Sequence, residues 1–98
     1  MSEQVTVIAR VRAKPGHEKQ VREELTRLLV PSRAETGCIN YDLHESAADP
    51  RDFMFHENWL TMAHLVLHRE TPHLKRLYEV LPALIEGKTD ITLWKQVG

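Results

Sequence analysis

The amino-acid sequence predicts an α+β fold in which helices pack on one face of an antiparallel sheet. Four stretches alternate between apolar and other side chains with a period of two, which is typical of strands. Between them, apolar residues recur at helical spacing. The order is strand, helix, two strands, helices, strand, which indicates the split βαβ arrangement of a ferredoxin-like domain with four strands. At 98 residues the chain is long enough for one such domain, expected over residues 1–98.

The first strand is expected at residues 5–12, followed by a turn and a helix. The apolar face of this strand is Val5, Val7, Ala9 and Val11. Pro15 and Gly16 indicate the turn. Residues 17–30 then change to helical spacing. This helix is expected to end near Pro31, because proline disfavours a helical conformation of the residue before it.

The second and third strands follow Gly37 and are separated by a turn at residues 47–51. Their odd-numbered side chains are the more apolar set and are expected to face the helices: Ile39, Tyr41, Leu43, Phe53, Phe55, Glu57 and Trp59. Glu57 is the exception in this set, since a carboxylate in an apolar layer must find a partner or take up a proton. An ion pair with an arginine or lysine and a catalytic role are both open.

Two further helices and a last strand complete the domain. Thr61 is expected to cap a short helix that runs to about Arg69. Thr71 and Pro72 start the next helix. The apolar stripe of that helix is Leu74, Leu77, Tyr78 and Leu81. Gly87 is expected to mark the end of the helical region, and residues 91–97 form the last strand.

The composition argues against several classes of protein. With 13 basic and 14 acidic residues and no basic cluster, the chain has no electrostatic footprint for nucleic acid. No segment reaches the roughly 18 apolar residues that span a membrane, and the N-terminus lacks the layout of a signal peptide. Cys38 is the single cysteine and is interpreted as a small buried hydrophobe, with no disulfide and no thiolate cluster. These features favour a cytoplasmic protein.

The face of the sheet that points away from the helices is expected to bind a second copy of the chain. Ile8, Met54 and Trp94 lie on it among polar neighbours, which makes it too apolar for a surface that meets only water. Two sheets packed face to face would cover these side chains. The sequence therefore predicts a homodimer, with His44 and His56 as interface residues.

Four of the six histidines lie between residues 56 and 73. His64 and His68 are four residues apart on one predicted helix, so their side chains share a face and could bind one metal. The glutamate of an HExxH motif is absent, because Leu65 follows His64, and the spacing specifies no third ligand. We therefore interpret the pair as histidines beside a pocket and expect no metal.

His68 and His73 are the candidate acid–base pair. An imidazole exchanges its proton near neutral pH, which suits proton transfer. His73 falls in the first turn of a helix, where the helix dipole disfavours the charged ring, whereas His68 closes the preceding helix, where the dipole favours it. Two rings biased in opposite directions can act as base and acid. The alternative is that both rings only cover the junction of two helices.

Aromatic side chains near these histidines predict a slot for a flat ligand. Trp59 ends the third strand just before the helix of His68, and Phe55 and Tyr41 share its face. Tyr78 on the last helix is a further candidate ligand contact. Trp59 could equally be a residue of the core.

Several segments resemble the antibiotic biosynthesis monooxygenase family over about residues 5–97: the first strand with its PG turn, then ETGCINYDLHES, FMFHENW and HRETPHLKRL. The residues that carry the resemblance are Gly37 and Cys38, Tyr41, Glu57 followed by Trp59, and His68 followed by Pro72 and His73. The resemblance implies a ferredoxin-like domain that dimerises through its sheets. It also implies oxidation of polycyclic phenols or quinols with molecular oxygen, without flavin, haem or metal, in a pocket lined by Trp59 and His68.

The protein is accordingly expected to act on a phenolic, quinol or anthrone-like substrate without a cofactor. Such a substrate can pass an electron to oxygen itself once it is deprotonated. The protein then needs a dry aromatic slot, a base, and donors for the developing oxyanion. His68 or His73 would be the base, and Asn40 or Asn58 the donors.

Three other functions remain open on the same fold. A haem-degrading relative pairs a tryptophan with a histidine that ligates iron, but it also uses an asparagine in the first strand, and VTVIARVR holds none. An isomerase of a small phosphorylated sugar-like signal would need cationic pocket residues, for which Arg33 or Lys75 are available. A dimeric ligand-binding or stress-response module needs no catalysis, since fold alone does not determine function.

Overall fold

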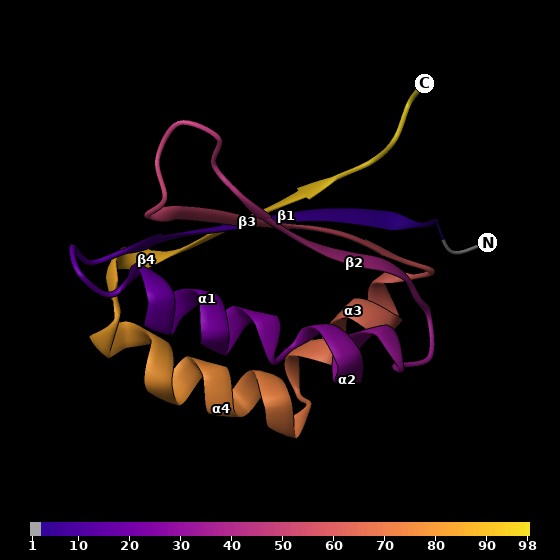
Figure 1. Ribbon diagram of the computed structural model, residues 1–98. Coiled ribbons are helices and arrows are strands. Elements are labelled where there is room, and N and C mark those ends of the chain that lie inside the picture. The colour runs from indigo at the N-terminus through magenta and orange to yellow at the C-terminus, as the bar shows by residue number, and fades with distance from the viewer. Residues whose placement is uncertain (1–2) are drawn as a thin grey trace.

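Four antiparallel strands form one sheet in the computed structural model, which describes residues 3–98 (Figure 1). The strands lie in the order β2-β3-β1-β4. Their bounds are β1 Val5–Ala13, β2 Cys38–Glu45, β3 Asp52–Trp59 and β4 Ile85–Trp94. The central strands are therefore the first and third along the chain, and the predicted split βαβ fold is confirmed.

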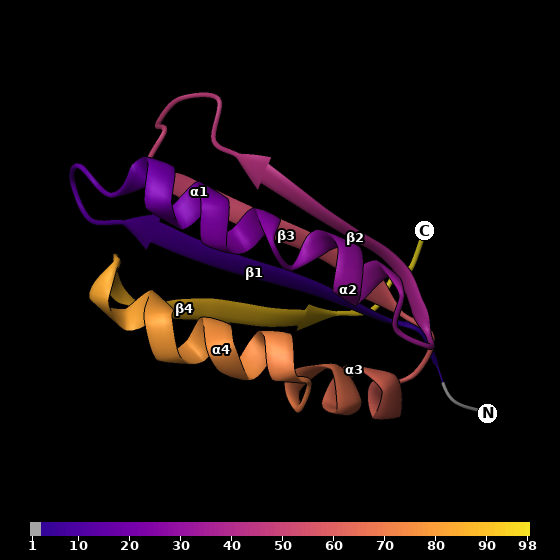
Figure 2. The ribbon, with the colours of Figure 1, turned by 60° about the horizontal axis from the view of Figure 1, so that its bottom comes forward.

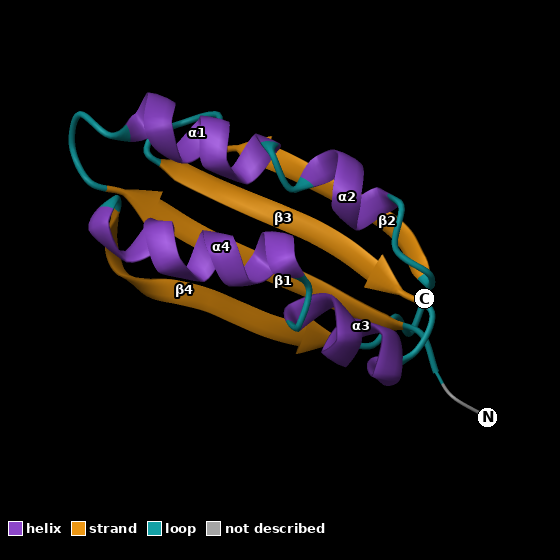
Figure 3. Cartoon of the chain, turned by 90° about the horizontal axis from the view of Figure 1, so that it is seen from below, coloured by secondary structure: helices purple, strands orange, loops and turns teal. Residues whose placement is uncertain are grey.

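The helices cover one face of this sheet (Figure 1). Their bounds are α1 Glu18–Thr26, α2 Leu29–Arg33, α3 Met62–Arg69 and α4 Pro72–Val80, followed by the short 3-10 turn η1 Leu81–Ala83. Seen from the helical side, α1 and α2 follow one another along one half of the sheet, and α4 and α3 lie along the other half (Figures 2 and 3). Within residues 3–98, no helix is long and apolar enough to cross a membrane.

The core lies between the sheet and the helices, as the alternation along the strands predicts. Odd-numbered strand residues form its floor, and helical residues three or four positions apart form its roof. The core includes Val7, Val11, Tyr41, Phe53, Phe55 and Trp59 from the strands, and Val21, Leu25, Leu65, Leu74 and Leu77 from the helices. Each such side chain stabilises the fold by roughly 1.5–3 kcal/mol through removal of apolar surface from water.

The helix boundaries differ from the prediction at two places. The single helix expected over residues 17–30 is interrupted at Arg27 and Leu28, and Pro31 lies inside the second piece, α2. Proline is tolerated there because it occupies the first turn of α2, where a backbone N–H has no partner within the helix. The helical region also ends before Gly87, since β4 already begins at Ile85.

Two irregularities in the sheet explain the remaining differences. Gly87 has a φ of +64° and lies inside β4, where the register with β1 shifts by a bulge. β4 therefore starts before residue 91 and ends at Trp94. A second shift, between Cys38 and Asn40, leaves Ile39 exposed, and Cys38 packs against the core in its place.

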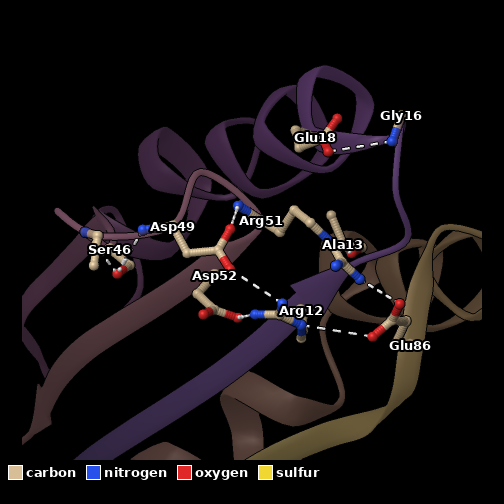
Figure 4. Close-up of polar contacts among 10 residues, drawn as sticks. Arg12, Ala13, Gly16, Glu18, Ser46, Asp49, Arg51, Asp52 and Glu86 are labelled. Carbon is tan, nitrogen blue, oxygen red and sulfur yellow. Dashed lines mark hydrogen bonds and ion pairs between the residues drawn. The ribbon is translucent and has the colours of Figure 1, made fainter.

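An ion-pair cluster joins the strands at one end of the sheet (Figure 4). Arg12 on β1 contacts Asp49 in the β2–β3 turn at 3.0 Å and Asp52 on β3 at 2.7 Å. Arg51 forms an ion pair with Glu86 on β4. Surface pairs of this kind contribute little energy each. Their effect here is to tie β1, β3 and β4 together at this end of the sheet.

The opposite face of the sheet carries no helix (Figure 1). Ile8 and Met54 are half-buried on it, and Trp94 is exposed. His44 and His56 occupy the same face, paired with Met54 and Ile8 respectively across the strands. The homodimer expected through this face stays a prediction.

Candidate active site

A cavity of about 40 Å³ lies between the sheet and the helices. Its wall is mostly apolar, with residues such as Val7, Val11 and Phe55 from the sheet and Leu65, Leu74 and Leu77 from the helices. Glu57, His68 and Arg69 are its ionisable groups apart from two tyrosines. An apolar cavity with a few polar groups is typical of a small-molecule site.

His68 is held rigidly at the junction of α3 and α4. The Thr71 hydroxyl donates a hydrogen bond to the carbonyl oxygen of His68 at 2.7 Å, which ends α3 and leads the chain into α4. The imidazole packs against Trp59, with ring centroids 4.4 Å apart, and against Tyr41 at 5.2 Å. Only 3% of His68 is exposed. These contacts fix the ring so that one side of it faces the cavity.

Glu35, in the loop between α2 and β2, bridges the two candidate histidines. Its Oε2 atom lies 2.8 Å from Nδ1 of His68 and 2.8 Å from Nε2 of His73. Sequence reasoning missed Glu35, because it lies in an irregular segment where no periodicity applies. Its one available signal was its place in ETGCINYDLHES, two residues before Gly37. We refer to Glu35, His68 and His73 as the triad.

The triad also consists of chemical types that bind divalent metals. Its donor atoms lie within 4.8 Å of one another, and it is the group of this kind found among the described residues. Hydrogen bonds already satisfy these atoms, because both nitrogens lie at hydrogen-bond distance from the same carboxylate oxygen. We therefore interpret the triad as a hydrogen-bonded unit.

The charge state of His68 differs from the one predicted from its helix. Burial lowers the pKa of His68, and the nearby positive charges of His73 and Arg69 act in the same direction. The hydrogen bond to Glu35 acts against them but does not reverse the shift. Loss of hydration therefore outweighs the helix dipole, which favours a charged ring at this position. The lowered pKa favours the neutral ring at pH 7, and a neutral ring can act as a base.

Glu57 lies in the floor of the cavity and is 4% exposed. Burial raises the pKa of its carboxyl to about 7. The indole Nε1–H of Trp59 donates a hydrogen bond to its Oε1 at 2.9 Å. The structure thus gives Glu57 an indole partner and shows no ion pair for it among residues 3–98. A large fraction of this carboxyl carries a proton at neutral pH.

Exposed residues of the lining mark the mouth of the cavity. Tyr78 on α4 and Ile91 on β4 are partly exposed there, and Arg69 at the end of α3 is exposed beside them. Arg69 lies close enough to Glu57 and His68 to act on the pKa of both groups. The mouth therefore combines an aromatic ring with one cation.

A family model described as antibiotic biosynthesis monooxygenase matches residues 4–80. The chain belongs to this family. The match spans β1 through α4 and so includes every residue of the triad, as well as Glu57.

Relatives of known sequence and structure agree with this assignment. A protein of Escherichia coli strain K12 named "Probable quinol monooxygenase YgiN" is 31% identical over 87 residues, covering 79% of this chain and 84% of that protein. An uncharacterized protein of Synechocystis is 29% identical over 91 residues, and this chain spans 62% of its length. The crystal structure of PA3566 from Pseudomonas aeruginosa has a TM-score of 0.94 and 37% identity, covering 100% of this chain and 98% of that one.

In this member of the antibiotic biosynthesis monooxygenase family, the cavity brings together five of the predicted site residues. They are Tyr41, Phe55, Glu57, His68 and Tyr78. Trp59 does not line the cavity; it is fully buried behind His68 and Glu57, which it contacts. His73 faces a second hollow between α4 and the end of α1, together with Glu24, Arg27 and Arg76.

Four other candidates lie away from the cavity. Asn58 donates its Nδ2–H to Oδ1 of Asn40 at 2.8 Å on the face of the sheet that carries no helix. Neither amide can serve as a donor inside the cavity, because successive side chains of a strand point to opposite faces. Arg33 and Lys75, considered for an anionic substrate, are likewise absent from the lining. The cation at the cavity is Arg69.

Proposed function

We propose that this protein is a cofactor-independent monooxygenase that oxidises a phenolic, quinol or anthrone-like substrate with molecular oxygen. The observation that carries the proposal is a buried imidazole in the wall of an apolar cavity, held in place by Glu35. Nδ1 of His68 is hydrogen-bonded to Glu35, so Nε2 is the nitrogen available to a bound molecule. Family membership and the printed name of the Escherichia coli relative support the use of oxygen and an aromatic substrate.

The chemistry requires only a base and a dry site at the start. An anthrone-like CH₂ group would lose one proton to Nε2 of His68 and become an electron-rich enolate. The enolate transfers one electron to dioxygen, and the resulting radical and superoxide combine into a carbon–peroxide bond. The peroxide takes up a proton on its outer oxygen. Removal of the second C–H proton by a carboxylate then breaks the O–O bond and leaves a carbonyl, and the departing hydroxide takes the proton held by His68 and becomes water. One oxygen atom enters the product, and the other leaves as water.

Glu57 is suited to the later proton transfer. Its carboxyl has a pKa of about 7, so it can hold a proton at neutral pH and release it to the peroxide oxygen that leaves as water. The indole N–H of Trp59 is hydrogen-bonded to Oε1 of Glu57, which leaves Oε2 of Glu57 for the substrate. Trp59 is thus a positioning residue in this proposal, because it orients both Glu57 and His68 from behind the cavity.

The aromatic lining of the cavity supports a flat substrate. Tyr41 and Phe55 lie side by side in its wall with ring centroids 4.7 Å apart, and Tyr78 stands at its mouth. Aromatic rings prefer such stacked or edge contacts with one another. A polycyclic phenol would place its rings against these residues and its acidic group near His68.

The proposal includes a homodimer through the open face of the sheet. The half-buried side chains of Ile8 and Met54 and the exposed indole of Trp94 lie on that face. A second copy of the chain would cover them and leave both cavities open on the outer, helical sides.

An oxygen electrode tests the proposed reaction directly. The protein, pretreated with EDTA, is mixed with anthrone or a substituted hydroquinone, and oxygen uptake is compared with a sample that lacks protein. The proposal predicts protein-dependent uptake with formation of a quinone or anthraquinone. Parallel samples receive haem, flavin or a divalent metal. Uptake that occurs only in one of these samples, or no uptake with any of the aromatic substrates, would contradict the proposal.

A further inference from the structure

We propose that Glu35 couples His68 in the cavity to His73 at the surface, so that the two imidazoles share one positive charge and His73 releases a proton to solvent when His68 takes up the substrate proton. This inference rests on the proposed function for its role in catalysis. The coupling itself is a property of the triad and can be measured without a substrate.

The triad connects two separate spaces in the molecule. His68 lines the cavity and is almost fully buried. His73 is 22% exposed and lines the second hollow, between α4 and the end of α1. Glu35 lies between them and is 14% exposed. One end of the unit therefore meets the substrate and the other meets water.

The shared oxygen determines the tautomer of both rings. A carboxylate oxygen only accepts hydrogen bonds, so Nδ1 of His68 and Nε2 of His73 must both be N–H donors to Oε2 of Glu35. In neutral His68 the proton then resides on Nδ1, and Nε2 keeps its lone pair for the substrate. On His73 the nitrogen left for exchange with solvent is Nδ1.

Electrostatics favours a single positive charge on the two rings. One carboxylate balances one imidazolium, and a second cation 6.1 Å away between ring centroids would be repelled. Burial disfavours the charge on His68, so we assign the resting charge of the pair to the more exposed ring, His73. Other charged groups also face the two rings. Arg69 and Glu57 lie near His68. The hollow beside His73 is lined by Glu24, Arg27 and Arg76. Glu24 is paired with Arg76 at 2.5 Å, so Glu35 is the carboxylate bonded to both rings.

The proton balance of one turnover follows from this arrangement. The substrate gives its proton to Nε2 of His68, which becomes an imidazolium. His73 then releases its Nδ1 proton to water and becomes neutral. Both N–H bonds to Glu35 stay in place, and no proton crosses the carboxylate. The pair returns to its starting state when protonated His68 gives its Nε2 proton to the hydroxide that leaves as water and His73 takes a proton back from solvent.

Kinetics of two triad variants test the catalytic role. His73→Gln keeps an N–H donor near Glu35 but cannot carry the charge, and Glu35→Gln removes the acceptor shared by both rings. We expect each variant to lower kcat at least about tenfold with little change in KM, because substrate contacts are kept. A small imidazole buffer should restore part of the rate of His73→Gln in proportion to its concentration. Glu70→Gln, an exposed change two residues after His68, should leave kcat as in the wild type.

Nitrogen NMR of labelled histidine tests the coupling independently of any activity. The wild type should show His68 protonated on Nδ1 and His73 protonated on Nε2. In His73→Gln, His68 should take up its second proton at a higher pH than in the wild type, because the neighbouring cation is gone. If Glu35→Gln does not fold, this comparison still decides the matter.

The outcomes separate the two proposals. Coupled titration without oxygen uptake would remove the proposed function and leave the charge sharing intact. Oxygen uptake with an unchanged kcat in His73→Gln, or an unchanged titration of His68 in that variant, would overturn the coupling. Displacement of the N–H signals by one equivalent of Zn²⁺ under the assay conditions, with a gain in activity, would also overturn it in favour of a metal site.

Discussion

The burial of Glu57 disfavours its ionised form and at the same time gives it the acidity that the proposed reaction uses. A carboxyl that is nearly fully buried among apolar side chains disfavours its ionised form, and this raises its pKa to about 7. The native protein therefore binds this proton more tightly than the unfolded chain does. The same property makes the group an acid at neutral pH.

Replacement of Glu57 by glutamine should change how stability depends on pH. Between about pH 4.5 and pH 7 the native state of the wild type holds the Glu57 proton and the unfolded state has released it. The free energy of unfolding therefore falls as the pH rises through this window, by roughly 3 kcal/mol from this group. Urea unfolding at pH 5 and pH 8 should show this loss in the wild type relative to Glu57→Gln. If the free energy of unfolding depended on pH equally in the wild type and in Glu57→Gln, the raised pKa assigned to buried Glu57 would be wrong.

The sequence predicted the residues of the site unevenly. Glu57 was recognisable because a carboxylate interrupts an apolar face. Tyr41 and Phe55 were recognisable because, like Glu57, they are odd-numbered strand residues and so point to the same face of the sheet. Glu35 was not, because it lies in a loop and meets its partners 33 and 38 positions away in the chain. The charge preference of His68 was predicted wrongly, since the dipole of a helix can be anticipated from sequence but the burial of its last residue cannot.

Gly37 fixes how closely α3 approaches the loop that carries Glu35. Its φ of +85° suits glycine, and a Cβ at this position would lie 2.3 Å from Cγ of His64 on α3. Because α3 also carries His68, this close approach helps bring Glu35 within hydrogen-bond distance of the imidazole. Elements that are distant in sequence thus meet at a position where only a hydrogen atom fits.

Gly37→Ala should be far more harmful than the same change at Gly16. Gly16 has the same φ of +85°, but a Cβ there would meet nothing within 4 Å. Gly16→Ala therefore isolates the backbone strain, about 1–2 kcal/mol, whereas Gly37→Ala adds a clash worth about 1–3 kcal/mol more. Chemical denaturation of both variants measures the difference. Equal losses would show that the contact with His64 does not constrain α3.

Element boundaries were less predictable than element types. The strands and helices appear in the predicted order, since a buried face leaves a regular pattern, but β4 begins earlier than predicted and the first helix is divided in two. Pro31 and Gly87 misled the prediction because proline is also accepted in the first turn of a helix and glycine is also accepted at a bulge. The same residue type has two structural uses, and tertiary packing decides between them.

At the scale of the whole molecule, the two faces of the sheet differ in what covers them. The helical face encloses the core and the cavity, and the other face is bare (Figure 1). The β2–β3 turn and the C-terminal segment extend on the bare side (Figure 1). A 98-residue chain buries a modest fraction of its surface, so a partner on this face would add to its stability.

Light scattering coupled to size-exclusion chromatography tests the dimer. The wild type should have a mass of about 23 kDa, twice the 11.4 kDa of one chain. Trp94→Asp places a charge on the bare face and should shift the protein toward a single chain. Val66→Asp, an exposed position on α3, should leave the mass unchanged. A wild-type mass near 11 kDa would contradict the dimer.

The initial rate of oxygen uptake by two histidine variants tests the proposed base most directly. His68→Gln removes the imidazole that lines the cavity, and His17→Gln changes an imidazole in the loop before α1, away from it. With EDTA present and a saturating anthrone or hydroquinone, His68→Gln should lower kcat by about 100-fold or more, the usual contribution of a general base, while His17→Gln keeps the wild-type rate. Wild-type turnover by folded His68→Gln would contradict the assignment of this cavity as the active site.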